Sequence, residues 1–230
     1  MIMTKKKKQI AKEIDLKRKY SLDDAINISK KFASKKFDES IDICIKLGID
    51  PKKSDQLVRG VVTLPKSKEK KIKVAVFAEG EEAEKAKKSG AEIVGSEDLI
   101  NDIKNGKIDF DKCISTPNMM PKVSVLGQIL GPKGLMPNPK LGTVSANLEE
   151  AIQKVKSGQL EFKTDKGGLV HASIGNCSLD QKDLTNNVKF FYSEILKTKP
   201  SSSKGIFIKE IFLTSTMGPG LKIEETSVIK

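Results

Sequence analysis

The segment from Thr214 to Gly220 (TSTMGPG) contains residue types that can contact phosphates and sugars. Its hydroxyl side chains can hydrogen-bond a phosphate oxygen or a ribose 2′-OH, and Met217 can pack against a sugar or a base. Gly218 and Gly220 lack a Cβ, so the backbone itself can approach a ligand closely. A plain hairpin turn is the alternative for the same residues. The candidate contacts in this segment are Thr214, Thr216, Met217 and Gly218.

A second candidate is Phe37, which directly follows Lys35 and Lys36. An aromatic ring beside lysines can stack on a nucleotide base while the lysines attract its phosphates. The alternative is that Phe37 closes one end of the hydrophobic core.

The third candidate is the glycine- and proline-rich segment from Gly127 to Gly142 (GQILGPKGLMPNPKLG). We expect its glycines and prolines to hold an exposed loop in one shape, which is a frequent arrangement at functional sites. Lys133 and Lys140 in this loop can approach phosphates. A stiff connection between domains is the alternative.

Residue patterns for catalysis are weak. His171, the single histidine, lies in a strand pattern, where a structural role is more common than catalysis. It is also a candidate for a secondary RNA contact, as are Lys133 and Lys140. The sequence contains no metal-ligand cluster and no Walker motif. Phe77-Ala78-Glu79-Gly80 stands where a dinucleotide-binding domain has its glycine-rich turn. We therefore expect no enzyme, no metal and no cofactor, and an α/β nucleotide-binding enzyme is the least supported alternative.

The basic excess favours a polyanionic partner, because each lysine near a phosphate displaces condensed counterions. Basic residues number 42 and acidic residues 30, a formal net charge of +12. Residues 1–67 and 159–230 together hold 27 basic and 17 acidic residues, whereas residues 68–158 hold 15 and 13. Only Arg18 and Arg59 are arginines, so few guanidinium groups can recognise base edges, and specificity must come from RNA shape. A lysine-rich, soluble surface is the alternative explanation of the charge.

Membrane insertion and disulfide bonding are not expected. No apolar run approaches the roughly 20 residues that span a bilayer, and no apolar segment follows the basic N-terminus as in a secretory signal. The cysteines, Cys44, Cys113 and Cys177, show neither metal-ligand nor disulfide spacing. We expect three buried, inert thiols in a reducing compartment.

The two ends of the chain predict mixed helices and strands. Ser21 and Asp24 resemble a capping box ahead of a helix, and the alternation over residues 41–47 predicts a strand with one buried face. Residues 160–164 and 169–174 flank a tight turn and predict a hairpin. We also expect a strand near Val61 to Leu64, a helix with Leu184, Val188, Phe191 and Ile195 on one face, and a last strand from Ile206 to Thr214.

The middle of the chain predicts a different domain. Residues 72–78 (IKVAVFA) form a nearly continuous apolar run, typical of a strand covered on both faces. Short strands then alternate with helices, which is typical of a Rossmann-like three-layer α/β domain with parallel strands. The expected elements are helices over residues 81–89 and 96–105, strands near residues 93–94 and 112–115, and a helix starting at Asn147.

The predicted fold class therefore combines α/β and α+β in two domains, one inserted into the other. A discontinuous α+β domain covers residues 1–67 and 159–230, and the inserted α/β domain covers residues 68–158. The charged segment 65–71 (PKSKEKK) predicts a linker. Two chain crossings, near residues 66–71 and 157–159, then form a hinge.

Five stretches of the chain match the pattern of one known family. They are, in order, KFDES at 36–40, LGIDPK at 47–52, SDQLVRG at 54–60, GPKGLMPNPKLGTV at 131–144 and TSTMGPG at 214–220. With these stretches the chain resembles, almost from end to end, the bacterial-type L-one family of large-subunit ribosomal proteins.

The resemblance implies a protein of the mobile stalk beside the tRNA exit site, with a discontinuous domain that binds large-subunit rRNA. It further implies a part in releasing deacylated exit-site tRNA and repression of translation through the leader of the protein's own mRNA. The expected protein is cytoplasmic, ribosome-bound as part of the large ribosomal subunit, and monomeric when free. The implied rRNA contacts are Lys36, Phe37, Ser40, Thr216, Met217 and Gly218.

Two positions depart from the family pattern. Asn176 follows Gly175 where lysine is usual, and Ser40 stands where threonine is usual. We expect the loss of one phosphate contact to weaken RNA binding modestly and to leave specificity largely intact.

Overall fold

The computed structural model describes residues 10, 13–15, 18–34, 36–66, 72–145, 147–203 and 205–229, without the side chains of Ser54 and Lys140. The chain divides into two units, which we call the outer unit (Met1–Lys68 with Leu160–Lys230) and the inserted unit (Glu69–Gln159). Most of the expected linker, residues 67–71, lies outside the described residues.

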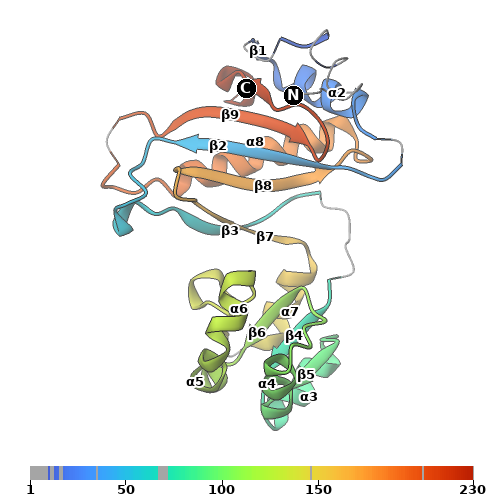
Figure 1. Cartoon of the computed structure of the whole chain (residues 1–230), viewed down its shortest axis with the longest axis vertical. Helices are drawn as coiled ribbons and strands as arrows, with labels where there is room; N and C mark the ends of the chain where they lie inside the picture. The colour runs from blue at the N-terminus through green and yellow to red at the C-terminus, as the bar shows by residue number, and fades with distance from the viewer. Residues whose placement is uncertain are drawn as a thin grey trace. The chain divides into compact units, whose positions relative to one another are not determined.

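A five-stranded sheet in the order β1-β10-β9-β2-β8 is the frame of the outer unit (Figure 1). Neighbouring strands are antiparallel, except that β1 and β10 are parallel. β2 lies between β9 and β8, so a strand from the N-terminal part of the chain is flanked by two C-terminal strands. The strands are β1 (Lys19–Tyr20), β2 (Ser40–Leu47), β8 (Leu169–Asn176), β9 (Ile208–Ser215) and β10 (Leu221–Ile223).

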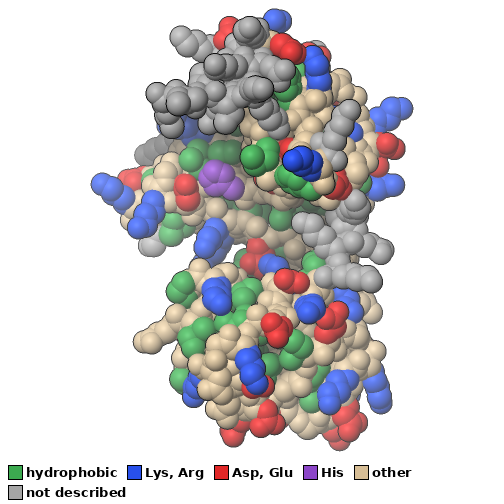
Figure 2. All heavy atoms as spheres, turned by 45° about the vertical axis from the view of Figure 1, so that its right-hand side comes forward, with side chains coloured by type: hydrophobic (Ala, Val, Ile, Leu, Met, Phe, Trp, Pro, Cys, Tyr) green, Lys and Arg blue, Asp and Glu red, His purple; other side chains and the backbone are tan. Residues whose placement is uncertain are grey.

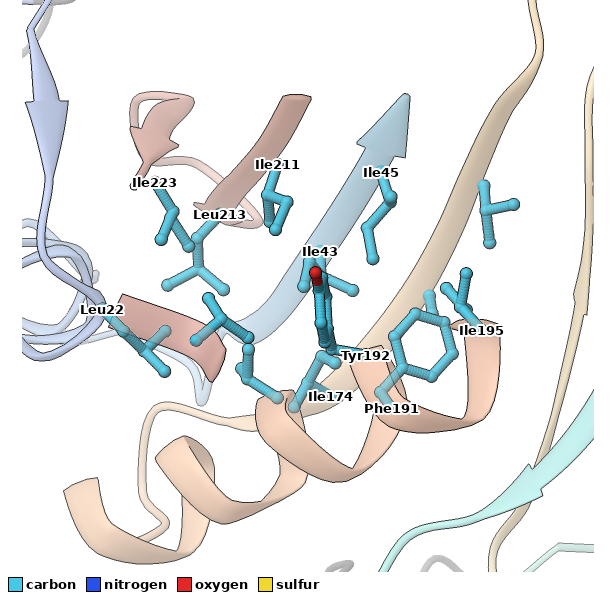
Figure 3. Packing of buried hydrophobic residues seen from close by; sticks show 14 of the residues in the cluster. Leu22, Ile43, Ile45, Ile174, Phe191, Tyr192, Ile195, Ile211, Leu213 and Ile223 are labelled. Atoms are coloured by element: carbon cyan, nitrogen blue, oxygen red, sulfur yellow. The ribbon is translucent and has the colours of Figure 1, made fainter. Parts of the chain in front are cut away.

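Helices cover one face of this sheet. α2 (Leu22–Lys31) begins after Ser21, whose hydroxyl accepts the Asp24 N–H at 3.2 Å, so the predicted helix start is confirmed. α8 (Gln181–Lys197) places its predicted apolar stripe in the core. In Figure 3, Ile43 and Ile45 of β2 point toward Phe191 of α8. A short helix, α9 (Glu225–Ile229), follows β10.

The alternation of β2 assigns its other side chains to the opposite face of the sheet. The odd-numbered residues from Ile41 to Leu47 are buried, whereas Ser40, Asp42, Cys44 and Lys46 are partly or fully exposed. The predicted strand with one buried face is thereby confirmed.

The predicted hairpin after residue 160 is only partly correct. Its turn forms, because the Asp165 carboxylate accepts the N–H groups of Gly167 at 2.8 Å and Leu169 at 2.9 Å. Gly168 supplies the positive φ of +74°. The flanking segments, however, are paired only at a single bridge, between Thr164 and Val170.

Beyond that bridge the two strands enter different sheets. β7 (Gln159–Lys163) pairs with β3 (Arg59–Thr63) in a two-stranded sheet, while β8 pairs with β2. Phe162 of β7 packs edge-to-face on Phe191 of α8, with ring centroids 5.6 Å apart. Burial of this aromatic pair favours the pairing of β7 with β3 over the predicted hairpin of β7 with β8.

The inserted unit has three layers. Its parallel sheet has the order β5-β4-β6, and every residue of β4 is buried. Val74, Val76 and Ile114 pack with α3 and α7 on one face. Ala75 and Phe77 pack with α4, α5 and α6 on the other. The predicted fold class is therefore confirmed.

The elements of the inserted unit form close to the predicted positions. The strands are β4 (Val74–Phe77), β5 (Ile93–Gly95) and β6 (Lys112–Ser115); the helices are α3 (Glu81–Lys88), α4 (Glu97–Lys104), α5 (Met120–Val123), α6 (Gly127–Lys133) and α7 (Leu148–Lys156). Among the described residues, the 3-10 helices are η1 (Ser54–Gln56), η2 (Pro117–Met119), η3 (Ser124–Leu126) and η4 (Pro139–Leu141).

The expected exposed loop over residues 127–142 is wrong in its first half, where α6 forms. Leu126 and Leu130 are completely buried, and this burial outweighs the poor helix propensity of the glycines and of Pro132. The helix ends at Gly134, whose φ of +70° lies in the left-handed region.

Two further expectations are corrected by the structure. The strand after residue 206 is not the last, because β10 follows it and buries Leu221 and Ile223. β10 was not predicted because its three residues are too few to show the alternation of a strand in the sequence. Cys113 is buried as expected, whereas Cys44 and Cys177 are only partly buried, and all three are free thiols.

Candidate nucleic-acid interface

Three loops of the outer unit meet where β2 begins. β2 is antiparallel to both of its neighbours, so Ser40 lies opposite Asn176 of β8, and Ile41 lies opposite Ser215 of β9. We call the surface formed by residues 36–40, 176–180 and 214–220 the loop cluster. It brings together the residues predicted to bind rRNA, which are Lys36, Phe37, Ser40, Thr214, Thr216, Met217 and Gly218.

A pair of hydroxyl groups lies at the centre of the loop cluster. The Oγ of Ser40 and the Oγ1 of Thr216 are 3.0 Å apart, and Thr216 Oγ1 also accepts the Ser40 N–H at 3.0 Å. The Thr216 N–H donates to the Ser40 carbonyl at 3.1 Å, which continues the ladder one residue beyond β9. The pair is therefore held in place while both hydroxyls stay at the surface, where they can contact a phosphate or a 2′-OH.

Two exposed apolar side chains belong to the same surface. Phe37 is 50% exposed and Met217 is 61% exposed. Phe37 therefore does not close the end of the core, and this alternative is excluded. Lys36 is exposed next to Phe37 in the chain. A ring, a thioether, two hydroxyls and an ammonium group thus face solvent in one cluster.

The tight turn after Thr216 requires glycine at position 218. The Gly218 N–H donates to the Ser215 carbonyl at 3.0 Å. A Cβ at Gly218 would lie 2.3 Å from the Oγ of the buried Ser215 side chain. The backbone of this loop therefore packs directly on β9. The predicted close approach of this glycine to a ligand stays a prediction.

Two carboxylates that sequence reasoning missed hold the loops together. Asp38 accepts the Asn176 side-chain amide at 3.1 Å and the Ser178 hydroxyl at 2.8 Å. Glu39 is completely buried, and its carboxylate accepts the N–H groups of Ser34 and Met217. The available signal was two acidic residues within a basic stretch that was predicted to contact RNA. Their partners are far away in sequence, so the pairs themselves were not predictable.

The carboxylates also affect the electrostatics of the cluster. Burial, together with the negative charges of Glu39 and Asp38, raises the pKa of the Cys177 thiol. Asn176, one of the two departures from the family pattern, donates a hydrogen bond from its side-chain amide to the Asp38 carboxylate.

The remaining predicted contacts lie outside the loop cluster. His171 is exposed on β8, opposite Cys44 of β2. Cys44 is four residues along β2 from Ser40, so His171 lies roughly 13 Å along the sheet from Ser40 at the usual rise of a strand. Its Nε2 lies 3.8 Å from Asp165, whose pKa is lowered mainly by the N–H of Leu169.

The two predicted lysines of the glycine- and proline-rich segment belong to the inserted unit. Lys133 is exposed in the last turn of α6. The Lys140 side chain lies outside the described part of the chain.

Thr214 has its hydroxyl engaged within the protein. Thr214 is on β9, opposite Asp42 of β2, and its Oγ1 donates to the Ser215 carbonyl at 2.9 Å. Thr214 therefore lies at the edge of the loop cluster and offers an outside ligand less hydrogen-bonding capacity than Thr216 does.

Charge is dispersed over the face shown in Figure 2, where Lys and Arg side chains alternate with Asp and Glu. Dispersed lysines attract a polyanion without selecting its shape. Any specificity on this face must come from fixed local geometry.

Within the described residues, no group of three or more His, Cys, Asp or Glu side chains is arranged to hold a metal ion. In the same part of the chain, no helix has the length and apolar character needed to cross a membrane.

Comparison with known proteins accounts for this combination of fold and loop cluster. The model of the ribosomal protein L1p/L10e family matches residues 29–219, which include the first two loops and all of the third except Gly220. The chain belongs to this family. It is 51% identical over 226 residues to the large ribosomal subunit protein uL1 of Polynucleobacter necessarius, with 98% of this chain and 97% of that protein covered. It is also 51% identical to the uL1 protein of Legionella pneumophila strain Corby, with 98% of each chain covered.

Membership of the L1p/L10e family settles the class of function. The chain is a structural protein of the large ribosomal subunit and not an enzyme. It is ribosome-bound in the cytoplasm. The resemblance drawn from the five sequence stretches is confirmed.

Proposed function

We propose that the loop cluster binds folded rRNA of the large-subunit stalk. The observation that carries this proposal is the exposure of Phe37 and Met217 around the fixed hydroxyl pair of Ser40 and Thr216. The Phe37 ring stacks on a base or packs on a sugar, and the hydroxyls bond phosphate or 2′-OH groups. Lys36 adds attraction that does not depend on sequence. Gly218 is proposed to contact the RNA through its backbone at this turn.

Secondary contacts extend this binding surface. We propose that His171, Lys133 and Lys140 contact RNA outside the loop cluster. The exposure of His171 and Lys133 supports the proposal for these two side chains. Each is expected to add affinity and little selectivity.

We propose further that the protein assists the release of deacylated tRNA from the exit site. In this proposal the outer unit is the rRNA-binding domain, and the inserted unit moves about the crossings near residues 66–71 and 157–159. The difference in net charge between the two parts of the sequence supports this division of tasks. The free protein is proposed to be a monomer.

The same surface is proposed to repress translation of the protein's own message. An mRNA leader that presents the shape of the rRNA site would occupy the loop cluster, because the cluster recognises shape and has few groups for base edges. Adding excess protein to a translation reaction tests this: output from a message with its own leader falls, and output with an unrelated leader does not.

A salt titration of RNA binding tests the central proposal. Wild type and Thr216→Val are titrated with a stalk-region rRNA fragment and with an unrelated folded RNA of equal length. Thr226→Val is the matched control, because Thr226 is exposed on α9, which follows the far end of β10. There Ile223 lies opposite Ile211, four residues along β9 from Ser215.

Wild type is expected to prefer the stalk fragment. Thr216→Val should lower affinity for that fragment about tenfold or more. The substitution removes the Thr216 hydroxyl, so the RNA loses a hydrogen-bonding partner and the Ser40 N–H loses its acceptor. The salt slope should stay unchanged because no charge is removed. Equal binding of both RNAs by wild type, lost at high salt, would refute specific rRNA recognition.

A further inference from the structure

Glu39 is an anomaly in a surface that binds a polyanion. Its side chain is completely buried. Burial of a carboxylate is costly unless hydrogen bonds compensate, and a negative charge beside phosphates opposes RNA binding. A residue with both disadvantages must provide something else at this position.

The contacts of Glu39 show what it provides. Its Oε1 accepts the Ser34 N–H at 2.6 Å, and its Oε2 accepts the Met217 N–H at 3.1 Å. Its backbone carbonyl accepts the Cys177 N–H at 2.8 Å. One residue thus joins the segment before β2 to the loops that follow β8 and β9.

These contacts fix the two apolar side chains relative to each other. Ser34 also orders the next turn, because its hydroxyl accepts the Lys36 N–H at 3.3 Å, directly before Phe37. The Met217 N–H points inward to Glu39, while the Met217 side chain remains exposed. The carboxylate therefore links the backbone on both sides of the hydroxyl pair.

We propose that Glu39 is a positioning residue for RNA recognition. Its carboxylate holds Phe37 and Met217 at one spacing before RNA arrives, so that only an RNA of matching shape fits both. This inference rests on the proposed rRNA-binding function of the loop cluster. Asp38 braces the neighbouring loop from an exposed position, where solvent screens its contribution.

Charge and positioning predict opposite signs for the same substitution. If the charge of Glu39 alone mattered, Glu39→Gln would remove a repulsion and tighten binding to every RNA. If positioning matters, the amide of Gln sets a donor against an N–H, and the loops lose their fixed spacing. Glu39→Asp keeps the charge but is one methylene too short for the same two N–H groups.

The test measures affinity for the stalk-region fragment and for a folded RNA of equal length, across a salt series. Both Glu39 variants are expected to lose about tenfold or more of the preference for the stalk fragment. Affinity for the unrelated RNA should stay equal or rise slightly for Glu39→Gln. Glu149→Gln, which removes one exposed charge on α7, should keep the preference of wild type.

Each outcome has one meaning. If both Glu39 variants keep the full preference, or if Glu39→Gln tightens binding to both RNAs alike, the positioning role is overturned. If wild type itself shows no preference, the proposed rRNA function fails, and the result does not concern Glu39.

Hydrogen exchange on the wild-type protein covers the case in which a variant does not fold. The amides of Ser34 and Met217 are expected to exchange slowly in free protein and to change little when RNA binds. Fast exchange that slows only with RNA would show that RNA orders the loops, and would overturn the proposal.

Discussion

Asn187 holds the edge of the main sheet, and its replacement should be costly. β8 is an edge strand, so among the described residues no further strand pairs with its outer side. The buried side-chain amide of Asn187, on α8, hydrogen-bonds the backbone of β8 instead. Its Nδ2 donates to the carbonyls of Lys66 at 2.6 Å and Ile174 at 3.0 Å, and its Oδ1 accepts the Lys66 N–H at 3.2 Å. At about 1 kcal/mol for each net hydrogen bond, Asn187→Ala should lower the free energy of unfolding by about 3 kcal/mol.

Urea unfolding followed by tyrosine fluorescence measures this loss. The chain has no tryptophan, and both tyrosines, Tyr20 and Tyr192, lie in the outer unit, so the signal reports that unit alone. Asn186→Ala is the matched control, because Asn186 is exposed on the same helix and should change stability by less than about 0.5 kcal/mol. Equal urea midpoints and slopes for the two variants would refute the argument.

Two titratable side-chain types give further predictions. Burial and the hydrogen bond to Glu225 raise the pKa of Tyr192 from 10.0 to about 12, so the folded state keeps a proton that the unfolded state releases. At about 1.4 kcal/mol per pKa unit, the resulting stabilisation is about 3 kcal/mol. It is complete below pH 10 and lost as pH rises to about 12. Urea unfolding at about pH 9 and about pH 11.5 should therefore show a loss of about 2 kcal/mol in wild type and no such loss in Tyr192→Phe. For the thiols, burial raises the pKa of Cys113, so Cys44 and Cys177 should react first with an alkylating reagent and Cys113 only after unfolding, as followed by mass spectrometry.

Elements with a clear local pattern were predictable from the sequence. The alternation in β2 and the capping box at Ser21 depend on neighbours within a few residues, and both form as predicted. The helix α6 was missed because glycine and proline disfavour a helix locally, whereas burial of Leu130 favours it, and burial depends on the rest of the fold. β7 was assigned to the wrong partner for a similar reason: strand pairing is not a local property.

The candidate site was predictable in its chemistry and not in its construction. Phe37, Thr216 and Met217 were recognisable because their types suit RNA and their stretches resemble a known family. The sequence left open whether Phe37 points into the core or into solvent, and only its 50% exposure decided this. Glu39 was not recognised, since its partners Ser34 and Met217 meet only after β2 and β9 have paired.

The sequence by itself determined the periodic helices and strands, the basic character of the two chain ends, and the family. These follow from side-chain types and from spacings of a few residues, which act locally whatever the rest of the chain does. Only the tertiary structure decided that segments 176 residues apart, at Ser40 and Thr216, share a hydroxyl pair. The physical reason is that the register of an antiparallel sheet sets such a contact, and the register is determined by burying one face of all its strands together.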